Sequence, residues 1–311
     1  MLVAKQDSGL SPSVSRVRED KTVHRIKTAV SRDEKSQWKY FQSFFDESIK
    51  THWWRLKSDC PAKFTPEVIS ELRTFQTDYA NRMQVNVNNC KNSVPEYQVL
   101  TSDIPGIFNL GGDLSYFHDL ITSGDRKALA DYAHSCVDLV YHNSTALGFP
   151  TTTIALVKGN AMGGGMEAAL SAQIIVAERQ VTMGLPEVLF NLFPGMGAYH
   201  FLRRRMSECQ AEKFILSGRM YSAEELHDLG IVDILAEPGE GENAVVRYIR
   251  KQRHQQKAIG GLRRVIRATD QVSRQTLIDA VDVWIDTAMD LDEPDLNKMR
   301  YLIRSQKNRG Y

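Results

Sequence analysis

Hydrophobic and aromatic residues become regular only after an N-terminal stretch, and their spacing then predicts where strands and helices begin. Residues 38–45 and 49–56 are aromatic-rich runs of strand length, separated by the polar residues 46–48. Such a pair predicts a β-hairpin. After the hairpin, Thr65 and Pro66 form a typical helix start, and the apolar residues that follow are spaced for one helical face. We therefore expect a hairpin followed by a helix that packs on a sheet.

Farther along the chain, strand patterns and helix patterns alternate. Residues 114–147 have a helical pattern that is interrupted at Ser123-Gly124-Asp125. Residues 166–170 form a second, shorter helix pattern directly after a glycine-rich turn at 159–165. The β-branched and apolar runs that predict further strands are residues 97–101, 152–157 and 174–177. This alternation is typical of an α/β architecture.

The two ends of the chain differ from this middle part. Residues 243–309 have the pattern of several amphipathic helices with no strand signal. The first residues are rich in Ser, Arg, Lys and Asp, and they hold too few hydrophobic residues to offset the entropy cost of folding. We therefore expect a flexible N-terminal arm at 1–34, a core at 35–235 and a helical C-terminal region at 236–311.

Composition limits the classes of function. The 311 residues are 42% hydrophobic and 25% charged, as in an ordinary globular protein. Lys and Arg (39) nearly balance Asp and Glu (38), so the net charge does not indicate a nucleic acid or an anionic membrane as partner. The four cysteines are scattered and predict neither a metal site nor disulfides. Because no apolar stretch approaches the roughly 18 residues of a membrane span, we expect a cytoplasmic protein without membrane insertion.

The most informative stretch joins a predicted strand to a glycine-rich turn and a glutamate. Residues 154–167 read Ile-Ala-Leu-Val-Lys-Gly-Asn-Ala-Met-Gly-Gly-Gly-Met-Glu, and Gly-Leu-Pro-Glu follows at 184–187. On its own, the triple glycine at 163–165 is more typical of a tight turn or a phosphate-binding loop, but no Walker A or GxGxxG pattern accompanies it. The whole arrangement, which ends in Glu167 and Glu187, resembles the signature of the crotonase (enoyl-CoA hydratase) superfamily.

Further matches to this superfamily extend over roughly residues 38–235. Residues 193–198, Phe-Pro-Gly-Met-Gly-Ala, resemble its Pro-Gly-x-Gly-x turn, and residues 108–114, Phe-Asn-Leu-Gly-Gly-Asp-Leu, resemble its Phe-Ser-x-Gly-x-Asp-Leu segment. Within the superfamily the chain is most similar to the diffusible signal factor synthases, which make cis-2-unsaturated fatty acid messengers. That narrower resemblance rests on residues 109–114, 148–151, 163–167 and 184–190.

The elimination of water from a 3-hydroxyacyl thioester requires three kinds of group. A base removes the weakly acidic C2 proton, an acid protonates the leaving hydroxyl, and hydrogen-bond donors stabilise the enolate charge. Two glutamates and two backbone N–H groups can supply all of them. Apolar neighbours such as Met166, Leu185 and Leu189 are expected to raise the pKa of a carboxyl group, which suits proton transfer near neutral pH.

The crotonase resemblance assigns these roles to particular residues. It implies that the N–H groups of Gly112 and Gly164 form an oxyanion hole, where glycine lets a carbonyl approach the backbone closely. It implies that Glu187 is the base at C2 and Glu167 the acid at the 3-hydroxyl, although the two roles can be exchanged or shared. Neither a metal nor a cofactor is expected. The residues expected to line the substrate pocket are Gly111, Met166, Leu185 and Trp284, the last with core packing as the alternative.

The resemblance also implies a fold, a function and partners. The expected fold is a crotonase-like spiral of repeated β-β-α units with a helical C-terminal region, and the expected assembly is a homo-oligomer, by family resemblance a trimer. The leading function is a dehydratase and thioesterase that converts a medium-chain 3-hydroxyacyl-acyl carrier protein to a free cis-2-unsaturated fatty acid used as a quorum-sensing signal, with a signal-sensor protein as a further partner. The alternatives are an enoyl-CoA hydratase of fatty-acid degradation acting on a CoA thioester, and a non-catalytic interaction protein, against which both glutamates argue.

Overall fold

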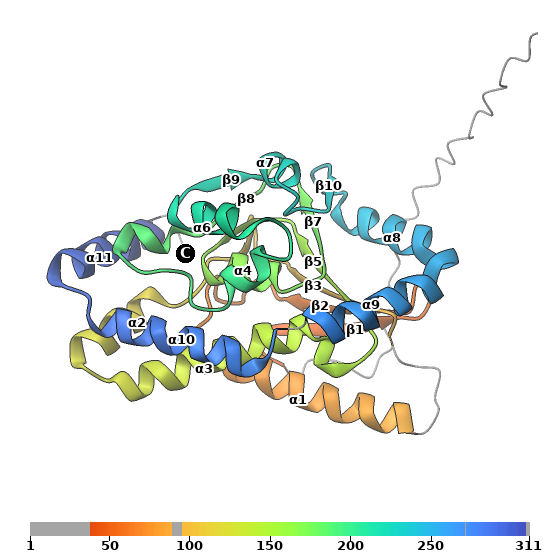
Figure 1. The fold of residues 1–311 in the computed structure, drawn as a ribbon, viewed down its shortest axis with the longest axis horizontal. Coiled ribbons are helices and arrows are strands. Elements are labelled where there is room, and N and C mark those ends of the chain that lie inside the picture. Colours follow the sequence, from red (N-terminus) through yellow and green to blue (C-terminus); the bar gives the residue numbers. More distant parts are fainter. Residues whose placement is uncertain (1–37, 89–94, 271, 309–311) are drawn as a thin grey trace, which may run out of the picture.

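Two sheets and a set of surrounding helices form the fold, shown in Figure 1. The computed structural model of the chain describes residues 38–88, 95–270 and 272–308. The predicted flexible arm at 1–34 lies outside the described residues. Within the described ranges, no helix combines the length and the apolar character needed to cross a bilayer.

The larger sheet has six strands, and its first two form the predicted hairpin. The hairpin strands are antiparallel, whereas the following neighbours pair in parallel. In spatial order the strands are β1 (Phe41–Asp46), β2 (Thr51–Leu56), β3 (Tyr97–Ser102), β5 (Thr152–Val157), β7 (Ile174–Glu178) and β10 (Ile234–Ala236).

Strand β5 shows why the parallel part of this sheet is apolar throughout. All of its residues are buried. Ala155 and Val157 face one hydrophobic cluster, whereas Ile154 and Leu156 face another that includes Val245 of the helix α8. Because both faces of the sheet are covered, the strand appears in the sequence as a continuous apolar run and does not alternate with polar residues.

The smaller sheet has four short strands. They are β4 (Ile107–Asn109), β6 (Asn160–Met162), β8 (Thr182–Gly184) and β9 (Met220–Ser222). Three of them, β4, β6 and β8, are parallel neighbours. Each follows a strand of the larger sheet, in the pairs β3–β4, β5–β6 and β7–β8, and each is followed by helix. These repeated β-β-α units confirm the predicted fold class.

The helices complete the repeats and form the C-terminal region, where the prediction of helices without strands is also confirmed. They are α1 (Pro66–Asn88), α2 (Leu114–Ser123), α3 (Arg126–Ser144), α4 (Gly164–Leu170), α5 (Ala198–Leu202), α6 (Glu208–Leu216), α7 (Ala223–Asp228), α8 (Gly241–Gln252), α9 (Gln256–Asp270), α10 (Arg274–Met289) and α11 (Glu293–Asn308), with the 3-10 helices η1 (Ala146–Gly148), η2 (Pro186–Phe190) and η3 (Arg253–Gln255).

Two sequence signals for helix ends are explained by the structure. The predicted break after α2 is made by Gly124, which has φ 71° and caps the helix, and by Asp125, whose side chain accepts a hydrogen bond from the N–H of Ala128 at the start of α3. The glycine-rich segment differs from its prediction. It contains the short strand β6, and α4 begins at Gly164, two residues before the expected start.

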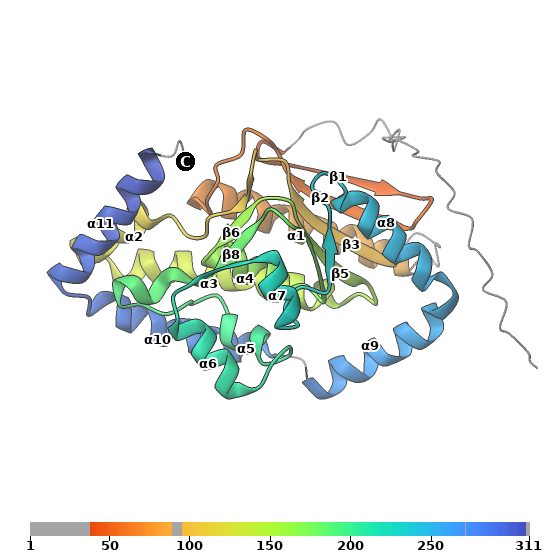
Figure 2. The ribbon, with the colours of Figure 1, turned by 90° about the horizontal axis from the view of Figure 1, so that it is seen from above.

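The last two helices return to the core. Helix α10 lies along α3, where Asp282 pairs with His134 at 2.7 Å and Arg274 pairs with Asp138 at 2.6 Å. Helix α11 lies beside α2, on the side of the molecule opposite α9 (Figure 2). Helices α10 and α11 therefore cover the same end of the molecule as α2 and α3.

Candidate active site

The loops that follow β4, β6 and β8 meet at one edge of the smaller sheet. Because these strands are parallel neighbours, their carboxyl ends lie side by side. The first loop contains Gly111 and Gly112, the second contains Gly163 and Gly164, and the third leads into η2, which carries Glu187. The three repeats of the fold thus bring the sequence motifs together.

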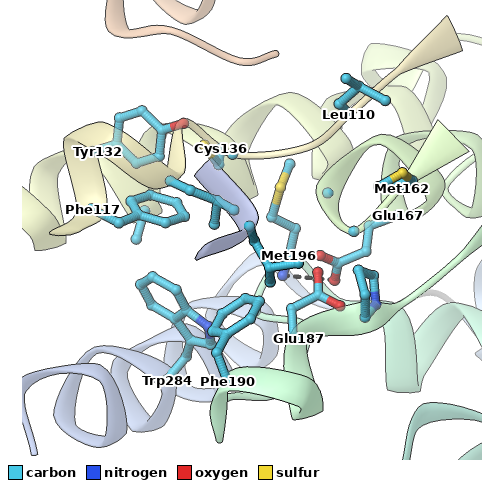
Figure 3. A pocket seen from close by; sticks show the side chains of 18 of the residues that line it. Leu110, Phe117, Tyr132, Cys136, Met162, Glu167, Glu187, Phe190, Met196 and Trp284 are labelled. Carbon is cyan, nitrogen blue, oxygen red and sulfur yellow. Dashed lines mark hydrogen bonds between the residues drawn. The ribbon is translucent and has the colours of Figure 1, made fainter. Parts of the chain in front are cut away.

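A cavity of about 260 Å³ lies at this meeting point (Figure 3). Its walls are mainly apolar and aromatic, and the carboxyl groups of Glu167 and Glu187 face each other on one side of it. Helices α2, α3, α10 and α11 supply the other side. The residues from these helices are Leu114, Phe117, Tyr132, Ala133, Cys136, Val281, Trp284 and Leu302.

Glu167 lies on α4 and is held by the turn that precedes α5. Its Oε1 accepts hydrogen bonds from the N–H of Met196 at 2.7 Å and from the N–H of Ala198 at 2.9 Å. The side chain is only 1% exposed. Burial raises the pKa of Glu167 above the ordinary glutamate value, and the two N–H donors act in the opposite direction. With Oε1 occupied by both donors, Oε2 is the oxygen that can hold a proton.

Glu187 faces Glu167 from η2. Its Oε2 is buried and has no hydrogen-bond partner among the described residues. Burial raises the pKa of Glu187, and so does the negative charge of Glu167 whenever Glu167 is ionised. The close fit depends on Gly163, which has φ +53° and where an added Cβ would lie 2.5 Å from Oε1 of Glu187. The two raised pKa values mean that the pair retains a proton at a pH where ordinary carboxyl groups are ionised.

The loop after β4, the first of the two predicted oxyanion loops, leaves one N–H group unused. Leu110 N donates to Ala62 O at 2.7 Å, and Gly111 O accepts from Phe64 N at 2.8 Å. Gly111 N donates to Oδ1 of Asn109 at 2.7 Å. The backbone groups of Leu110 and Gly111 are thus hydrogen-bonded to the rest of the fold. The N–H of Gly112, which lines the cavity, donates to no acceptor among the described residues.

The second donor is the N–H of Gly164, the first residue of α4. The first N–H groups of a helix have no partner within it and carry the positive end of its dipole. Added Cβ atoms show how close the two loops are: on Gly111 it would lie 2.9 Å from Gly164 N, and on Gly164 it would lie 3.6 Å from Gly112 N. Both donors therefore border the same small volume of the cavity, where a carbonyl oxygen can accept from the two of them.

Five of the predicted site residues line this cavity. They are Gly112, Gly164, Glu167, Glu187 and Trp284. For Trp284 core packing and pocket lining occur together, because the indole is only 6% exposed and packs on Gly195, where a Cβ would lie 2.8 Å from its ring.

Three predicted pocket residues lie outside the lining of this cavity, namely Gly111, Met166 and Leu185. Met166 and Leu185 are buried in the core. Met166 precedes Glu167 in a helix and therefore points to another side, and Leu185 directly precedes the 3-10 helix that carries Glu187. Leu189, expected to desolvate a glutamate, is 52% exposed.

Several site residues were not predicted from the sequence. Phe117 stacks edge-on against Trp284 at 5.3 Å and against Tyr132 at 5.1 Å, which joins α2, α3 and α10 around the cavity. Tyr132 and Cys136 are four residues apart, and this spacing places them on one face of α3. The spacing alone predicts a buried helix face, so it could not distinguish a cavity wall from ordinary core.

The raised pKa values give a testable dependence of stability on pH. The folded protein holds protons that the unfolded chain releases above the ordinary glutamate pKa of about 4.3, so stability falls as pH rises from there through the folded-state values. We expect Glu187→Gln to raise the melting temperature at about pH 9 by roughly 3 °C, with much less effect at about pH 5. Thermal unfolding at both pH values measures this, and an equal shift at both would contradict the charge effect.

Comparison with known proteins identifies the family to which this fold belongs. A mixed α/β fold of β-β-α repeats with paired glutamates and two backbone donors defines a crotonase-type protein. The model of the enoyl-CoA hydratase/isomerase family matches residues 72–283, more than half of the chain. The chain therefore belongs to the enoyl-CoA hydratase/isomerase family.

Two curated relatives share part of their sequence with it. The peroxisomal fatty acid beta-oxidation multifunctional protein AIM1 of Arabidopsis thaliana is 31% identical over 135 residues, which are 43% of this chain and 18% of the relative. The fatty acid oxidation complex subunit alpha of Pseudomonas syringae pv. tomato is 28% identical over 196 residues, 63% of this chain and 25% of the relative. The chain thus spans a quarter or less of the length of these proteins.

Solved structures are similar in fold. Enoyl-CoA hydratase from Bacillus halodurans has a TM-score of 0.69 at 18% identity, with 85% of this chain and 100% of the other covered. Pseudomonas aeruginosa DspI has a TM-score of 0.60 at 22% identity, with 84% and 100% covered.

Proposed function

We propose that this chain is an acyl-thioester dehydratase that also hydrolyses its product, releasing a 2-unsaturated fatty acid. The observation that carries the proposal is the pairing of Glu167 and Glu187, both with raised pKa values, beside two unused N–H donors on one apolar cavity. The substrate class is a medium-chain 3-hydroxyacyl thioester. Its acyl chain lies against the aromatic walls, and its carbonyl oxygen accepts from Gly112 and Gly164.

In the first step water is eliminated. The carboxylate of Glu187 removes the C2 proton, and the charge moves to the carbonyl oxygen, where the N–H groups of Gly112 and Gly164 stabilise it. The C3–O bond then breaks as Oε2 of Glu167 donates its proton, so hydroxide leaves as water and the C2–C3 double bond forms. Glu187 ends protonated and Glu167 ends ionised, and the reverse assignment balances equally well.

In the second step water is added to the thioester carbonyl. The water released by elimination lies next to Glu167, which is now a carboxylate and has the protonation state of a general base. It removes a proton from water, the oxygen adds to the carbonyl carbon, and the same two N–H groups stabilise the oxyanion. Collapse of this adduct to the free acid expels the carrier thiolate, which takes up the proton held by Glu187, so that Glu187 is again a carboxylate and Glu167 again protonated.

The signal-synthase assignment is supported by the resemblance of four segments, at 109–114, 148–151, 163–167 and 184–190, with Met166 directly before Glu167. The segment at 148–151 lies outside the motifs given above for the crotonase superfamily as a whole. On this assignment the carrier is an acyl carrier protein, the double bond is cis, the product is a quorum-sensing signal, and a sensor protein and a trimeric assembly are further expectations.

A second candidate is an enoyl-CoA hydratase of fatty-acid degradation. It is favoured by membership of the enoyl-CoA hydratase/isomerase family and by the similarity in fold to the enoyl-CoA hydratase from Bacillus halodurans. It uses the same glutamates and the same donors, with CoA as carrier, and it forms no free acid. The cavity chemistry is common to both candidates, so the fate of the thioester distinguishes them.

Product analysis tests the choice. Purified protein is given a medium-chain 3-hydroxyacyl-acyl carrier protein, and in parallel the matching CoA thioester, while free thiol is titrated and lipids are analysed by mass spectrometry. We expect free carrier thiol and a 2-unsaturated free acid, with thiol appearing after the enoyl thioester. If all product remains thioester-bound, the hydrolytic step is wrong and the hydratase assignment replaces it.

A further inference from the structure

The side chain of Asn109 touches the first oxyanion loop from behind, away from the substrate cavity. We propose that Asn109 is a positioning residue that fixes the direction of the Gly112 N–H group. The inference rests on the proposed function, because it concerns the donor that receives the thioester carbonyl.

Asn109 is the last residue of β4 and is only 1% exposed. Its Oδ1 accepts a hydrogen bond from the N–H of Gly111 at 2.7 Å. A side-chain oxygen that accepts from the N–H two residues later forms an Asx-turn, which sets the direction of the chain that follows. In this chain the turn leads directly to Gly112, whose N–H is the first oxyanion donor.

The loop needs such a restraint because of its composition. Gly111 and Gly112 are consecutive glycines, and glycine has the widest choice of backbone conformations. Gly111 has φ +88°, and an added Cβ there would lie 2.8 Å from Met162 O, so a side chain cannot replace the glycine to stiffen the loop. The hydrogen bond that Gly111 N donates to Asn109 restrains the Leu110–Gly111 peptide without occupying that space. The next peptide, which carries the Gly112 N–H, is held at its carbonyl by Phe64 N, so the two bonds together fix the direction of that N–H.

Asn109 also contacts the second oxyanion loop. A Cβ added to Gly165 would lie 2.0 Å from the carbonyl oxygen of Asn109 and 3.0 Å from its Cβ. The first turn of α4, which supplies the Gly164 donor, therefore packs directly on Asn109. Asn109 thus contacts both donor segments, the first through its side-chain oxygen and the second through its backbone and Cβ, and only the first contact depends on the amide.

The orientation of the amide follows from the same contact. Oδ1 faces the Gly111 N–H, so Nδ2 points in another direction, and Asn109 also lines a small cavity of about 60 Å³ between α1, α3 and the larger sheet. No described residue accepts a hydrogen bond from Nδ2. Among the described residues, the Asn109 amide therefore makes one hydrogen bond, in which Oδ1 accepts from the N–H of Gly111.

The test compares Asn109→Ala with Asn109→Ser and with a control, Asn143→Ala. Serine keeps an oxygen that can accept from the N–H two residues later. Asn143 lines the same small cavity and is 5% exposed, but its side chain bonds to Ser171 at 2.8 Å and to Gln98 at 3.3 Å, not to the oxyanion loop. Loss of packing in the cavity is thus matched between the two alanine variants.

Two measurements are made on each protein. The first is kcat and KM for dehydration. The second is the carbonyl stretching band of a bound, ¹³C-labelled acyl-CoA that lacks the 3-hydroxyl group, observed by infrared difference spectroscopy. Donors to the carbonyl oxygen lower this frequency, so the band reports the oxyanion hole without any turnover. A wild-type enzyme that shows the shift but no dehydration would refute the proposed function and leave the role of Asn109 testable.

We expect Asn109→Ala to lower kcat by at least ~10-fold with KM within about threefold of wild type, a fraction of the loss of a whole oxyanion donor. Its carbonyl band should move toward the unbound frequency. Asn109→Ser should recover most of both effects, and Asn143→Ala should change neither. If the two alanine variants behave alike in both measurements, the positioning role is wrong. If Asn109→Ala does not fold, an unchanged carbonyl band in Asn109→Ser keeps the inference and a lost shift overturns it, since serine retains the acceptor.

Discussion

Changing Glu167 or Glu187, the two proposed acid-base residues, to glutamine should lower the rate of dehydration by at least ~10²-fold while the protein remains folded. Glutamine keeps the size of the side chain but can neither take up nor donate the proton that elimination requires. In Glu167→Gln the amide oxygen can still accept from the N–H groups of Met196 and Ala198, so the turn before α5 should keep its shape. Steady-state dehydration of a 3-hydroxyacyl thioester, with circular dichroism for folding, measures the effect.

The chain offers a matched control in Glu178. This glutamate is 3% exposed, and its Oε1 also accepts a backbone hydrogen bond, from Gly241 N at 3.1 Å, but it does not line the cavity. Glu178→Gln should therefore retain dehydration within a few-fold of wild type. A Glu167 or Glu187 variant that turned over as fast as this control would remove that glutamate from the acid-base chemistry.

The second large effect is expected at Gly164. A Cβ at this position would lie 2.6 Å from Sδ of Met196 and 3.6 Å from Gly112 N, so the branches of valine would fill the space where the carbonyl oxygen binds. Removal of one oxyanion donor typically costs about 10²- to 10³-fold in rate. Gly164→Val should lower dehydration and thioester hydrolysis together by at least ~10²-fold, as measured by enoyl product and by free thiol.

Gly260→Ala is the matching control for loss of a glycine. Gly260 lies in α9, and an added Cβ would meet no atom within 4 Å. Alanine there should leave both activities unchanged and slightly favour the helix. If Gly164→Val kept one activity and lost the other, the two steps would not share an oxyanion hole.

The parts of the fold that depend on local patterns could be predicted from the sequence. The hairpin, the strand β5, the break at Gly124 and the helical C-terminal region each have a signal within a few residues, and each is present. The short motifs that carry the two glutamates and the two glycines follow strands whose ends meet, so these residues line one cavity, and their roles in catalysis stay predictions.

The remaining part of the site depends on contacts between distant segments. Phe117, Tyr132 and Leu302 come from three helices that approach each other only in the folded chain, so no spacing in the sequence links them. Met166 and Leu185 were expected to line the pocket but do not line the cavity, because residues close in sequence to Glu167 and Glu187 need not face the same side. Met196 and Ala198 belong to the Pro-Gly-x-Gly-x turn at residues 193–198. That their N–H groups donate to Glu167 could be learned only from the folded structure.

The two parts of the site come from different regions of the chain. The reacting groups come from the ends of the β-β-α repeats, whereas Val281, Trp284 and Leu302 come from the last two helices of the chain. Substitutions at Val281 or Leu302 should therefore change the space offered to an acyl chain while the two glutamates keep their positions. Trp284 couples the two parts, because it also packs on Gly195, beside the Met196 N–H that holds Glu167.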